Sequence, residues 1–336
     1  MADLAPAEIL AAYYPDGINH QETIPGGEIN TTLLITKKGG GKTILQRLSK
    51  IYDASMGEDY EALAAYLKDK GWEIASALKS NSGATYTSDK SGRLWRSFSY
   101  IESVAGSKFE GDLEASEKLG GLLGKLHIAL AAFDYQPKFR VPHFQDTDYY
   151  VSKLKTMRAK IPDPASWELA TEMMALSNEI GVVNRPEQLI HGDTRIGNTL
   201  FRQGKPFTFI DWDGLKTANP LIDVGDMLQS TVGEVITKGK KSCSLAQLYP
   251  ILEAYYREAG LTSDKQAFMA EALTAAQVIA LNLGIRHLID SVEDCYFLWD
   301  TTLFESRLAF NLFGARRQWQ VHEVLIGKQS TQNALD

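Results

Sequence analysis

Apolar and polar residues follow two different periods along the chain, and the change of period divides the chain near residue 103. Apolar and β-branched residues form two runs, 29–36 and 43–48, on either side of a glycine-rich turn at 37–42. Two further runs, 84–87 and 94–100, surround a turn at 88–92. These runs predict antiparallel strands joined by short turns.

Helical spacing also appears in the first part of the chain. Tyr60, Leu63, Ala64 and Leu67 recur at intervals of three or four residues and predict a helix over 57–70. A shorter helix is predicted over residues 6–14, ending at Pro15. After Glu102 the helical period dominates, with helices predicted over 112–132, 146–160 and 163–180 and from Asp223 to the end.

The pattern therefore predicts an α/β protein of the α+β type with two lobes. Residues 1–103 would form a small antiparallel-sheet lobe, and residues 104–336 a mainly helical lobe. A chain of 336 residues is long enough for two lobes.

Composition narrows the function and the location. A net charge of −7 gives no electrostatic support for nucleic-acid binding. Cys243 and Cys295 are far apart and have no metal-binding spacing, which favours a reducing compartment without disulfides. The first residues do not resemble a signal peptide, and no apolar run long enough to span a bilayer is expected. We predict a cytoplasmic protein with neither a membrane nor a nucleic acid as partner.

A predicted hairpin at residues 190–213 brings oxygen-bearing side chains together. Asn198 precedes the first strand, a turn follows at 204–206, and the second strand ends at Asp211. Because antiparallel strands bring their outer ends together, Asn198 and Asp211 are expected to be neighbours. Mg²⁺ prefers oxygen ligands and is usually held by one or two carboxylates plus substrate phosphates. Asn198 and Asp211 are therefore the candidate metal ligands.

Asp193 lies one loop before Asn198 and is the candidate catalytic base. A base Asp, a metal-binding Asn and a metal-binding Asp occur in the same order in kinase catalytic loops. Arg195 is placed to neutralise the transferred phosphoryl group, and an ion pair to Asp193 or Asp213 is compatible with that role. Asp213 would either bind a second Mg²⁺ or support the first site. His191 is expected to be structural, and Asp193 could instead cap a helix or close a turn.

The hairpin resembles the catalytic motif of the aminoglycoside phosphotransferase and choline kinase family, which has a protein-kinase-like fold. Within that group the chain is most similar to the bacterial N-acetylhexosamine 1-kinases. Further similar segments extend the resemblance over roughly residues 20–320, namely 27–32, 43–47, 81–86 and 284–290. The resemblance also implies that Asp223, at the start of a helix, braces the backbone of the catalytic loop.

The resemblance implies a nucleotide site in the first lobe, with ATP as the cofactor beside Mg²⁺. Gly27, Asn30 and Thr31 would belong to a loop that covers the phosphates. Kinase folds usually place a phosphate-binding Lys on the third strand, paired with a helix Glu. Here Gln46 occupies that position, and Glu61 would be the matching acid. The segment 98–103 resembles the hinge, whose backbone at Tyr100, Ile101 and Glu102 would bind adenine.

The second substrate is expected near residues 286–296. Arg286 and Asp290 are four apart on one helical face, so an intrahelical ion pair is the common outcome. The same segment resembles the sugar site of N-acetylhexosamine kinases, which implies that Arg286, Asp290 and Tyr296 bind substrate. His287 departs from the apolar residue of those enzymes, which leaves the identity of the sugar open.

Together these features predict a small-molecule kinase that transfers the γ-phosphoryl group of ATP to a hydroxyl of an amino sugar or related sugar. Choline, ethanolamine, homoserine and aminoglycosides are alternative acceptors, so the partner is a sugar or an amino alcohol. Two other classes stay open. A regulatory pseudokinase would explain the missing lysine, whereas a metal-dependent phosphohydrolase would need more ligands than this hairpin supplies.

Overall fold

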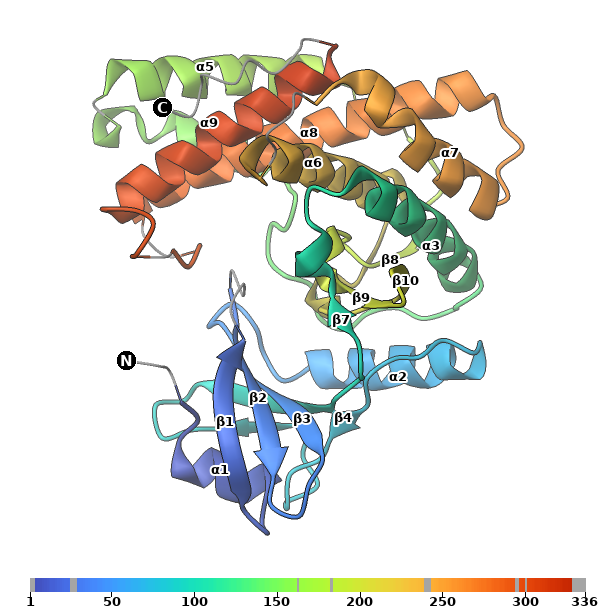
Figure 1. Cartoon of the computed structure of the whole chain (residues 1–336). Helices are drawn as coiled ribbons and strands as arrows, with labels where there is room; N and C mark the ends of the chain where they lie inside the picture. The colour runs from blue at the N-terminus through green and yellow to red at the C-terminus, as the bar shows by residue number, and fades with distance from the viewer. Residues whose placement is uncertain are drawn as a thin grey trace. The chain divides into compact units, whose positions relative to one another are not determined.

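The computed structural model describes residues 4–24, 29–161, 163–181, 184–238, 243–293, 296–299 and 301–327. The chain divides into two compact units (Figure 1). The first unit is Met1–Ser103 with Pro137–Pro142, and the second is Val104–Gln136 with His143–Asp336. The segment Pro137–Pro142 is held in the first unit by Asp59, whose carboxylate accepts hydrogen bonds from the backbone N–H groups of Lys138 and Phe139.

The first unit is built on one antiparallel sheet with the strand order β1-β2-β3-β6-β4, and β5 also pairs with β6. Its strands are β1 (Ile18–Ile24), β2 (Thr31–Lys37), β3 (Lys42–Arg47), β4 (Ala77–Leu78), β5 (Tyr86–Ser88) and β6 (Leu94–Ser99). Its helices are α1 (Ala7–Tyr13) and α2 (Met56–Asp69). The predicted strand runs and both helices are present, whereas β1 and β4 were not expected.

The two faces of this sheet bury different side chains. Leu33, Leu45 and Trp95 point to one face, where they pack with Ile9 and Tyr13 of α1. On the opposite face the ring of Phe98 lies 4.9 Å from the ring of Tyr60 in α2. Because alternate residues of a strand point to opposite faces, each strand contributes to both layers. Thr32, Gln46 and Arg96 lie on the α2 face.

The second unit is mainly helical, as expected. Its helices are α3 (Leu113–Ala131), α4 (Thr147–Lys155), α5 (Pro164–Glu179), α6 (Leu221–Lys238), α7 (Tyr249–Glu258), α8 (Lys265–Glu293) and α9 (Arg307–Leu325). Its strands are β7 (Val104–Ala105), β8 (Gln188–Ile190), β9 (Thr199–Arg202), β10 (Lys205–Phe209) and β11 (Lys216–Ala218). Short 3₁₀ turns lie at Gly106–Phe109, Arg158–Lys160, Ile196–Asn198, Trp212–Gly214 and Leu245–Gln247.

Aspartate caps explain where three of these helices begin. The carboxylate of Asp112 accepts from backbone N–H groups in the first turn of α3, and Asp146 and Asp163 do the same for α4 and α5. Pro164 follows Asp163 at a position where a helix needs no N–H donor. These local signals account for the close agreement between the predicted and observed starts.

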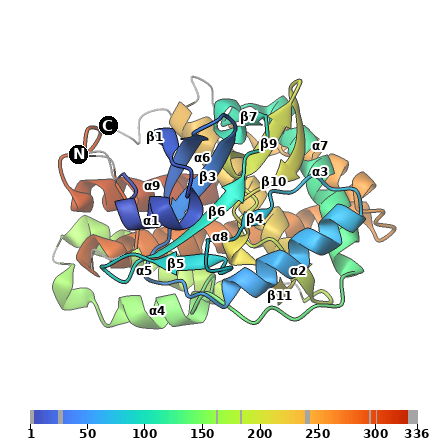
Figure 2. The ribbon, with the colours of Figure 1, turned by 90° about the horizontal axis from the view of Figure 1, so that it is seen from below.

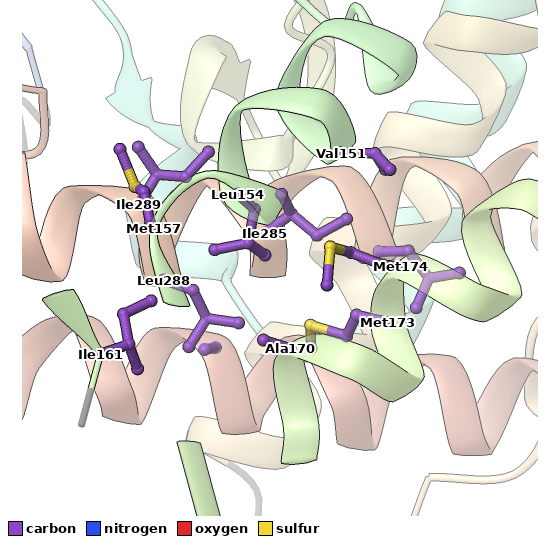
Figure 3. Close-up of a cluster of buried hydrophobic side chains, with 12 residues drawn as sticks. Val151, Leu154, Met157, Ile161, Ala170, Met173, Met174, Ile285, Leu288 and Ile289 are labelled. Carbon is purple, nitrogen blue, oxygen red and sulfur yellow. The ribbon is translucent and has the colours of Figure 1, made fainter. Parts of the chain in front are cut away.

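Helix α8 forms the centre of the second unit. Leu281, Ile285, Leu288 and Ile289 pack against residues of α4 and α5, and Ala315 of α9 completes the cluster (Figure 3). Figures 1 and 2 show α5 beside α8 and α9. The sequence was expected to contain no apolar run long enough to span a bilayer, and this was wrong. Among the described helices, α8 alone is long and apolar enough to cross a membrane by length and composition. More than half of its most apolar stretch is buried, as in the core helix of a folded domain.

The contact between α3 and α7 gives a test of this packing. A Cβ on Gly124 would lie 2.7 Å from Ala259 N and 2.8 Å from Tyr255 O, both backbone atoms. A Cβ on Gly121 in the same helix would meet only the side-chain Cγ of Glu258, at 3.4 Å. Gly124→Ala should therefore lower the free energy of unfolding by about 1–3 kcal/mol, because α7 must move away.

Gly121→Ala is the matched control, since the same methyl group at this site should be neutral or stabilise the helix by up to about 1 kcal/mol. Urea unfolding of both variants, followed by circular dichroism, measures the difference. Equal stabilities of the two variants would contradict the close packing of α3 on α7.

Candidate active site

The predicted catalytic loop, residues 191–198, is held by one buried carboxylate. The Oδ2 and Oδ1 atoms of Asp223, at the start of α6, accept hydrogen bonds from the backbone N–H groups of His191 (2.8 Å) and Gly192 (2.7 Å). Asp223 is completely buried. Burial alone would raise the pKa of this carboxyl, but the hydrogen bond from His127 and the charges of His127 and His191 lower it below its usual value. The expectation that Asp223 braces this loop is confirmed.

Two further buried residues extend this network, and the sequence did not reveal them. His127 of α3 contacts Asp223 Oδ2 through Nε2 (3.0 Å), and its Nδ1 contacts the hydroxyl of Tyr255 in α7 (2.7 Å). The signal was present as a lone histidine on the apolar stripe of Leu119, Leu123, Leu126 and Leu130. Its partners could not be identified from sequence, because they lie about 100 residues away in the chain.

The loop makes a tight turn at Gly192, which has a φ of +87°. A Cβ there would lie 2.3 Å from the backbone oxygen of Gly214, so only glycine fits. The ring of His191 is buried, and burial lowers its pKa. Its Nδ1 accepts from the backbone N–H of Asp193 (3.2 Å), so Nε2 carries the proton and donates to Ile210 O (3.1 Å). His191 therefore has the structural role expected for it.

Asn198 joins the segments that carry the other predicted site residues. Its side-chain Nδ2 donates to the backbone oxygen of Asp193 (3.2 Å), and its backbone oxygen accepts from Ile210 N (2.8 Å). Strands β9 and β10 pair antiparallel, as predicted. Asp211 follows with φ +64° and ψ +63°, a left-handed conformation that is uncommon outside glycine. The structure thus brings Asp193, Asn198 and Asp211 together.

Charged residues surround this group. The Nε atom of Arg195 lies 3.8 Å from Asp193 Oδ1, so the predicted ion pair is present. Asp213 is nearly buried in the turn after Asp211. Asp226 of α6 accepts a hydrogen bond from Thr194 N (2.7 Å). Burial, followed by the charges of Asp193 and Asp223, holds the pKa of Asp226 well above its usual range. Asp226 therefore keeps its proton to a higher pH than an exposed aspartate would.

The donor set fits Mg²⁺ better than a transition metal. The described residues contain no group of three or more His, Cys, Asp or Glu side chains that could hold a metal ion. Asn198 and Asp211 instead offer an amide and a carboxylate oxygen. The hydrogen bond from Asn198 Nδ2 to Asp193 directs the amide oxygen away from the loop backbone. One carboxylate, one amide and substrate phosphates are typical of a protein Mg²⁺ site.

In the first unit, the predicted nucleotide residues lie on or beside the sheet. Asn30 is nearly buried and accepts from Ser49 N (2.9 Å), while Thr31 accepts from Arg47 Nη2 (3.1 Å). Tyr100, Ile101 and Glu102 follow β6 as a segment without regular structure, in which Tyr100 and Ile101 are partly buried and Glu102 is exposed. Gly27 lies outside the described residues.

The expected pairing of Gln46 with Glu61 is wrong. Glu61 of α2 forms an ion pair with Lys79 and accepts from Thr85, and these interactions lower its pKa. Gln46 contacts its neighbours within the sheet instead. An uncharged amide cannot neutralise a carboxylate. Lys79, which follows β4, neutralises Glu61 instead.

The predicted ion pair between Arg286 and Asp290 is also absent among the described residues. Asp290 is 1% exposed and accepts hydrogen bonds from the backbone N–H groups of Tyr296 (2.7 Å) and Phe297 (3.2 Å) and from Asn311 Nδ2 (3.2 Å). Its carboxylate therefore shapes the chain after α8, which does not match a role in contacting substrate. His287 contacts Asn311 Oδ1 (3.0 Å) and stacks on Phe297, so it supports the same segment.

The guanidinium of Arg286 is surrounded by aromatic rings. Its Cζ lies 4.4 Å from the ring centroid of Tyr296 and 5.5–5.7 Å from those of Tyr150, Phe144 and Phe297. This aromatic cage adjoins the catalytic loop, because Gln145, next to Phe144, donates to the backbone oxygen of Gly192 (3.2 Å). Gln145 is held in turn by Lys216 (2.6 Å). Sequence reasoning had identified Arg286 and Tyr296 but not Phe144, Gln145 or Tyr150.

Comparison with known proteins identifies relatives over most of the chain. Residues 20–257 match the phosphotransferase enzyme family. Stress response kinase A of Shigella flexneri is 27% identical over 219 residues, which cover 61% of this chain and 60% of that protein. The chain thus matches about 60% of the length of this curated relative.

Solved structures with the same fold include several small-molecule kinases. An amicoumacin kinase in complex with AMP-PNP and Ca²⁺ has a TM-score of 0.63 at 16% identity, covering 94% of this chain and 91% of that one. A microcompartment-associated aminopropanol kinase has a TM-score of 0.63 at 15% identity, covering 91% and 92%. A Plasmodium vivax ethanolamine kinase has a TM-score of 0.58 at 13% identity, covering 92% and 83%. At these identities the similarity demonstrates the fold.

Beside the catalytic loop, Glu234 of α6 makes stability depend on pH. Burial, followed by the charge of Glu110, raises its pKa from 4.5 to about 7. Between these values the folded state keeps a proton that the unfolded state has released. The free energy of unfolding should therefore fall as the pH rises from about 4.5 to about 7. A shift of this size corresponds to a loss on the order of 3 kcal/mol above that range.

Glu234→Gln should remove this dependence, because the amide does not titrate and can still accept the hydrogen bond from Gly111. The free energy of unfolding of the variant, relative to that of the wild type, should increase as the pH rises from 5 to 8. Urea unfolding at both pH values measures the gain, with Glu117→Gln on the exposed face of α3 as control. A difference between variant and wild type that stays constant with pH would contradict the raised pKa.

Proposed function

The chain belongs to the phosphotransferase enzyme family, and from this premise we propose that it is an ATP- and Mg²⁺-dependent kinase that phosphorylates a hydroxyl of a small molecule. The observation that carries the proposal is the position of Asn198. This residue makes hydrogen bonds to the segments that carry Asp193 and Asp211. These two hydrogen bonds support the order of base, metal-binding Asn and metal-binding Asp that is expected of a kinase catalytic loop.

Asp193 is the proposed catalytic base. Its side chain is 36% exposed, which leaves it accessible to an acceptor hydroxyl, while its backbone is held by His191 and Asn198. A carboxylate fixed in this way orients the hydroxyl and takes its proton as the new P–O bond forms. Arg195, at 3.8 Å from Asp193, would balance the charge of the transferred group.

Asn198 and Asp211 would hold Mg²⁺, and Asp213 lies close enough in sequence to support them. The ion would supply positive charge to the phosphate oxygens during transfer. The protein contributes the pre-formed arrangement of the two ligands. The hairpin pairing and the left-handed backbone at Asp211 support this arrangement.

The nucleotide would be bound by residues of the first unit. Asn30, Thr31 and Gln46 lie on β2 and β3 or just before them, and Tyr100, Ile101 and Glu102 offer backbone groups to adenine. Glu61 is not part of this proposal, because Lys79 already neutralises it. Phosphate binding therefore does not use the lysine and glutamate pair of protein kinases.

The acceptor is proposed to be an acylated amino sugar or a related neutral sugar. The aromatic cage around Arg286 offers flat apolar surfaces for a sugar ring and a cationic donor for a carbonyl oxygen. Choline, ethanolamine and aminoglycosides carry positive charge, which this guanidinium would repel. Asp290 is already engaged by backbone N–H groups and by the guanidinium of Arg307, whose Nη1 lies 3.7 Å from its Oδ2.

The two other classes are less well supported. A metal-dependent phosphohydrolase usually needs a richer set of ligands, and the described residues contain no cluster of three or more acidic, His or Cys ligands. A pseudokinase usually lacks part of the catalytic set, whereas Asp193, Asn198 and Asp211 are all present and brought together.

ADP release in a panel of acceptors tests the proposal. The wild type should release ADP with at least one sugar, and Asp193→Asn should lower kcat by roughly 10²–10⁴ because it removes the base. Asp134→Asn, at an exposed site outside the catalytic loop, is the matched control. Phosphate release from phosphorylated sugars without ATP would instead favour a phosphohydrolase, and full activity of Asp193→Asn would contradict the assigned base.

Arg286→Met tests the acceptor site. The variant should raise KM for the acceptor about tenfold or more and leave KM for ATP nearly unchanged, because a charged hydrogen bond to the acceptor is lost. Arg158→Met removes another arginine that lies over a ring and should change neither constant. In the wild type, N-acetylated hexosamines should be better acceptors than the free amines. A preference for choline, ethanolamine or an aminoglycoside would overturn this assignment.

A further inference from the structure

A row of polar side chains crosses three neighbouring strands in the first unit. Thr32 of β2 is paired with Gln46 of β3, and Gln46 is paired with Arg96 of β6. Their side chains lie on the same face of the sheet as Phe98, the face that is covered by α2. Arg96 is a charged residue in the interior of a sheet, with only 3% of its surface exposed. Burying such a group is costly unless it is paired and hydrogen-bonded.

The hydrogen bonds along this row determine how the Gln46 amide is oriented. Arg96 Nε donates to Gln46 Oε1 (2.9 Å), and Gln46 Nε2 donates to Thr32 Oγ1 (3.2 Å). A guanidinium can only donate, so the amide oxygen must face Arg96 and the NH₂ group must face β2. Strand β2 follows the segment that is proposed to cover the phosphates. The NH₂ group of Gln46 thus faces Thr32 of β2.

Gln46 retains donor capacity in this orientation. An amide NH₂ group has two N–H bonds, and within the part of the chain that the structure describes, Thr32 accepts one of them. The adjacent guanidinium withdraws electron density through the amide oxygen, which makes the N–H bonds stronger donors. Arg96 itself is stabilised by the face of the Phe98 ring, 5.0 Å away. The pair therefore offers a charge-assisted donor to an anion.

We propose that Arg96 is a positioning residue that acts through Gln46 to bind the ATP phosphates, in place of the lysine that protein kinases have on this strand. The inference rests on the proposed kinase function. Arg96 places a permanent positive charge one hydrogen bond behind the position that the lysine would occupy. Glu61 is consistent with this arrangement, because Lys79 neutralises it and no cation on β3 is needed as its partner.

The arrangement has a specific energetic consequence. The contribution of Arg96 to the binding free energy depends on the charge of the ligand. It should therefore be large for ATP and ADP and absent for adenosine. A residue that only maintained the fold would affect all three ligands alike. Removal of a charge-assisted hydrogen bond typically weakens binding about tenfold or more.

Calorimetric titration of the full-length protein with ATP, ADP and adenosine tests the inference. Arg96→Met should weaken ATP and ADP binding about tenfold or more and leave adenosine binding unchanged. Arg93→Met is the matched control, since Arg93 lies just before the same strand and its side chain donates to the backbone oxygen of Leu48. Unchanged ATP binding in Arg96→Met, or an equal loss for adenosine, would overturn the inference.

A double-mutant cycle tests whether Arg96 acts through Gln46. Gln46→Met should reproduce the loss of ATP affinity, and the double variant should lose no more than either single variant. Gln46→Lys in the Arg96→Met background should restore ATP binding, because it returns the lysine to its usual position. Additive losses, or a failure of this rescue, would show that Arg96 does not act through Gln46. A wild-type protein that binds neither ATP nor ADP would instead refute the proposed function itself.

Discussion

The predicted catalytic loop of the second unit depends on one buried group, the carboxylate of Asp223. It is fully enclosed and yet has a lowered pKa, so it must keep its hydrogen-bond partners to remain charged without a large penalty. Those partners are the backbone of His191 and Gly192 and the ring of His127. The requirement fixes the catalytic loop to α6 and α3 at the same time. Through Tyr255 it extends to α7 as well.

The catalytic loop carries this constraint to the candidate site. His191 links the loop to Ile210, because its Nε2–H donates a hydrogen bond to the backbone oxygen of Ile210. Asn198 joins the backbone of Asp193 to the residue that follows β10. Asp193 and Asp211 are therefore positioned by hydrogen bonds that involve no substrate. Pre-organisation of this kind lets a phosphotransferase stabilise developing charge without rearranging its own groups during transfer.

Much of the fold could be predicted because its signals are local. Alternating residues marked the strands of the first unit, and Asp112, Asp146 and Asp163 cap helices within a few residues of the predicted starts. Two expected pairings failed because they were inferred from spacing or analogy. Asp290 is satisfied by backbone N–H groups instead of Arg286, and Glu61 by Lys79 instead of Gln46.

The sequence by itself predicted most of the strands and helices, the hairpin of β9 and β10, and the candidate base and metal ligands. The tertiary structure alone decided which charges meet. His127 reaches Asp223 across 96 positions, and Arg96 reaches Gln46 across 50. Helical spacing and strand alternation are set by neighbouring residues, whereas a buried charge is neutralised by whichever group the packed elements bring to it. That choice depends on the whole fold, and no local pattern encodes it.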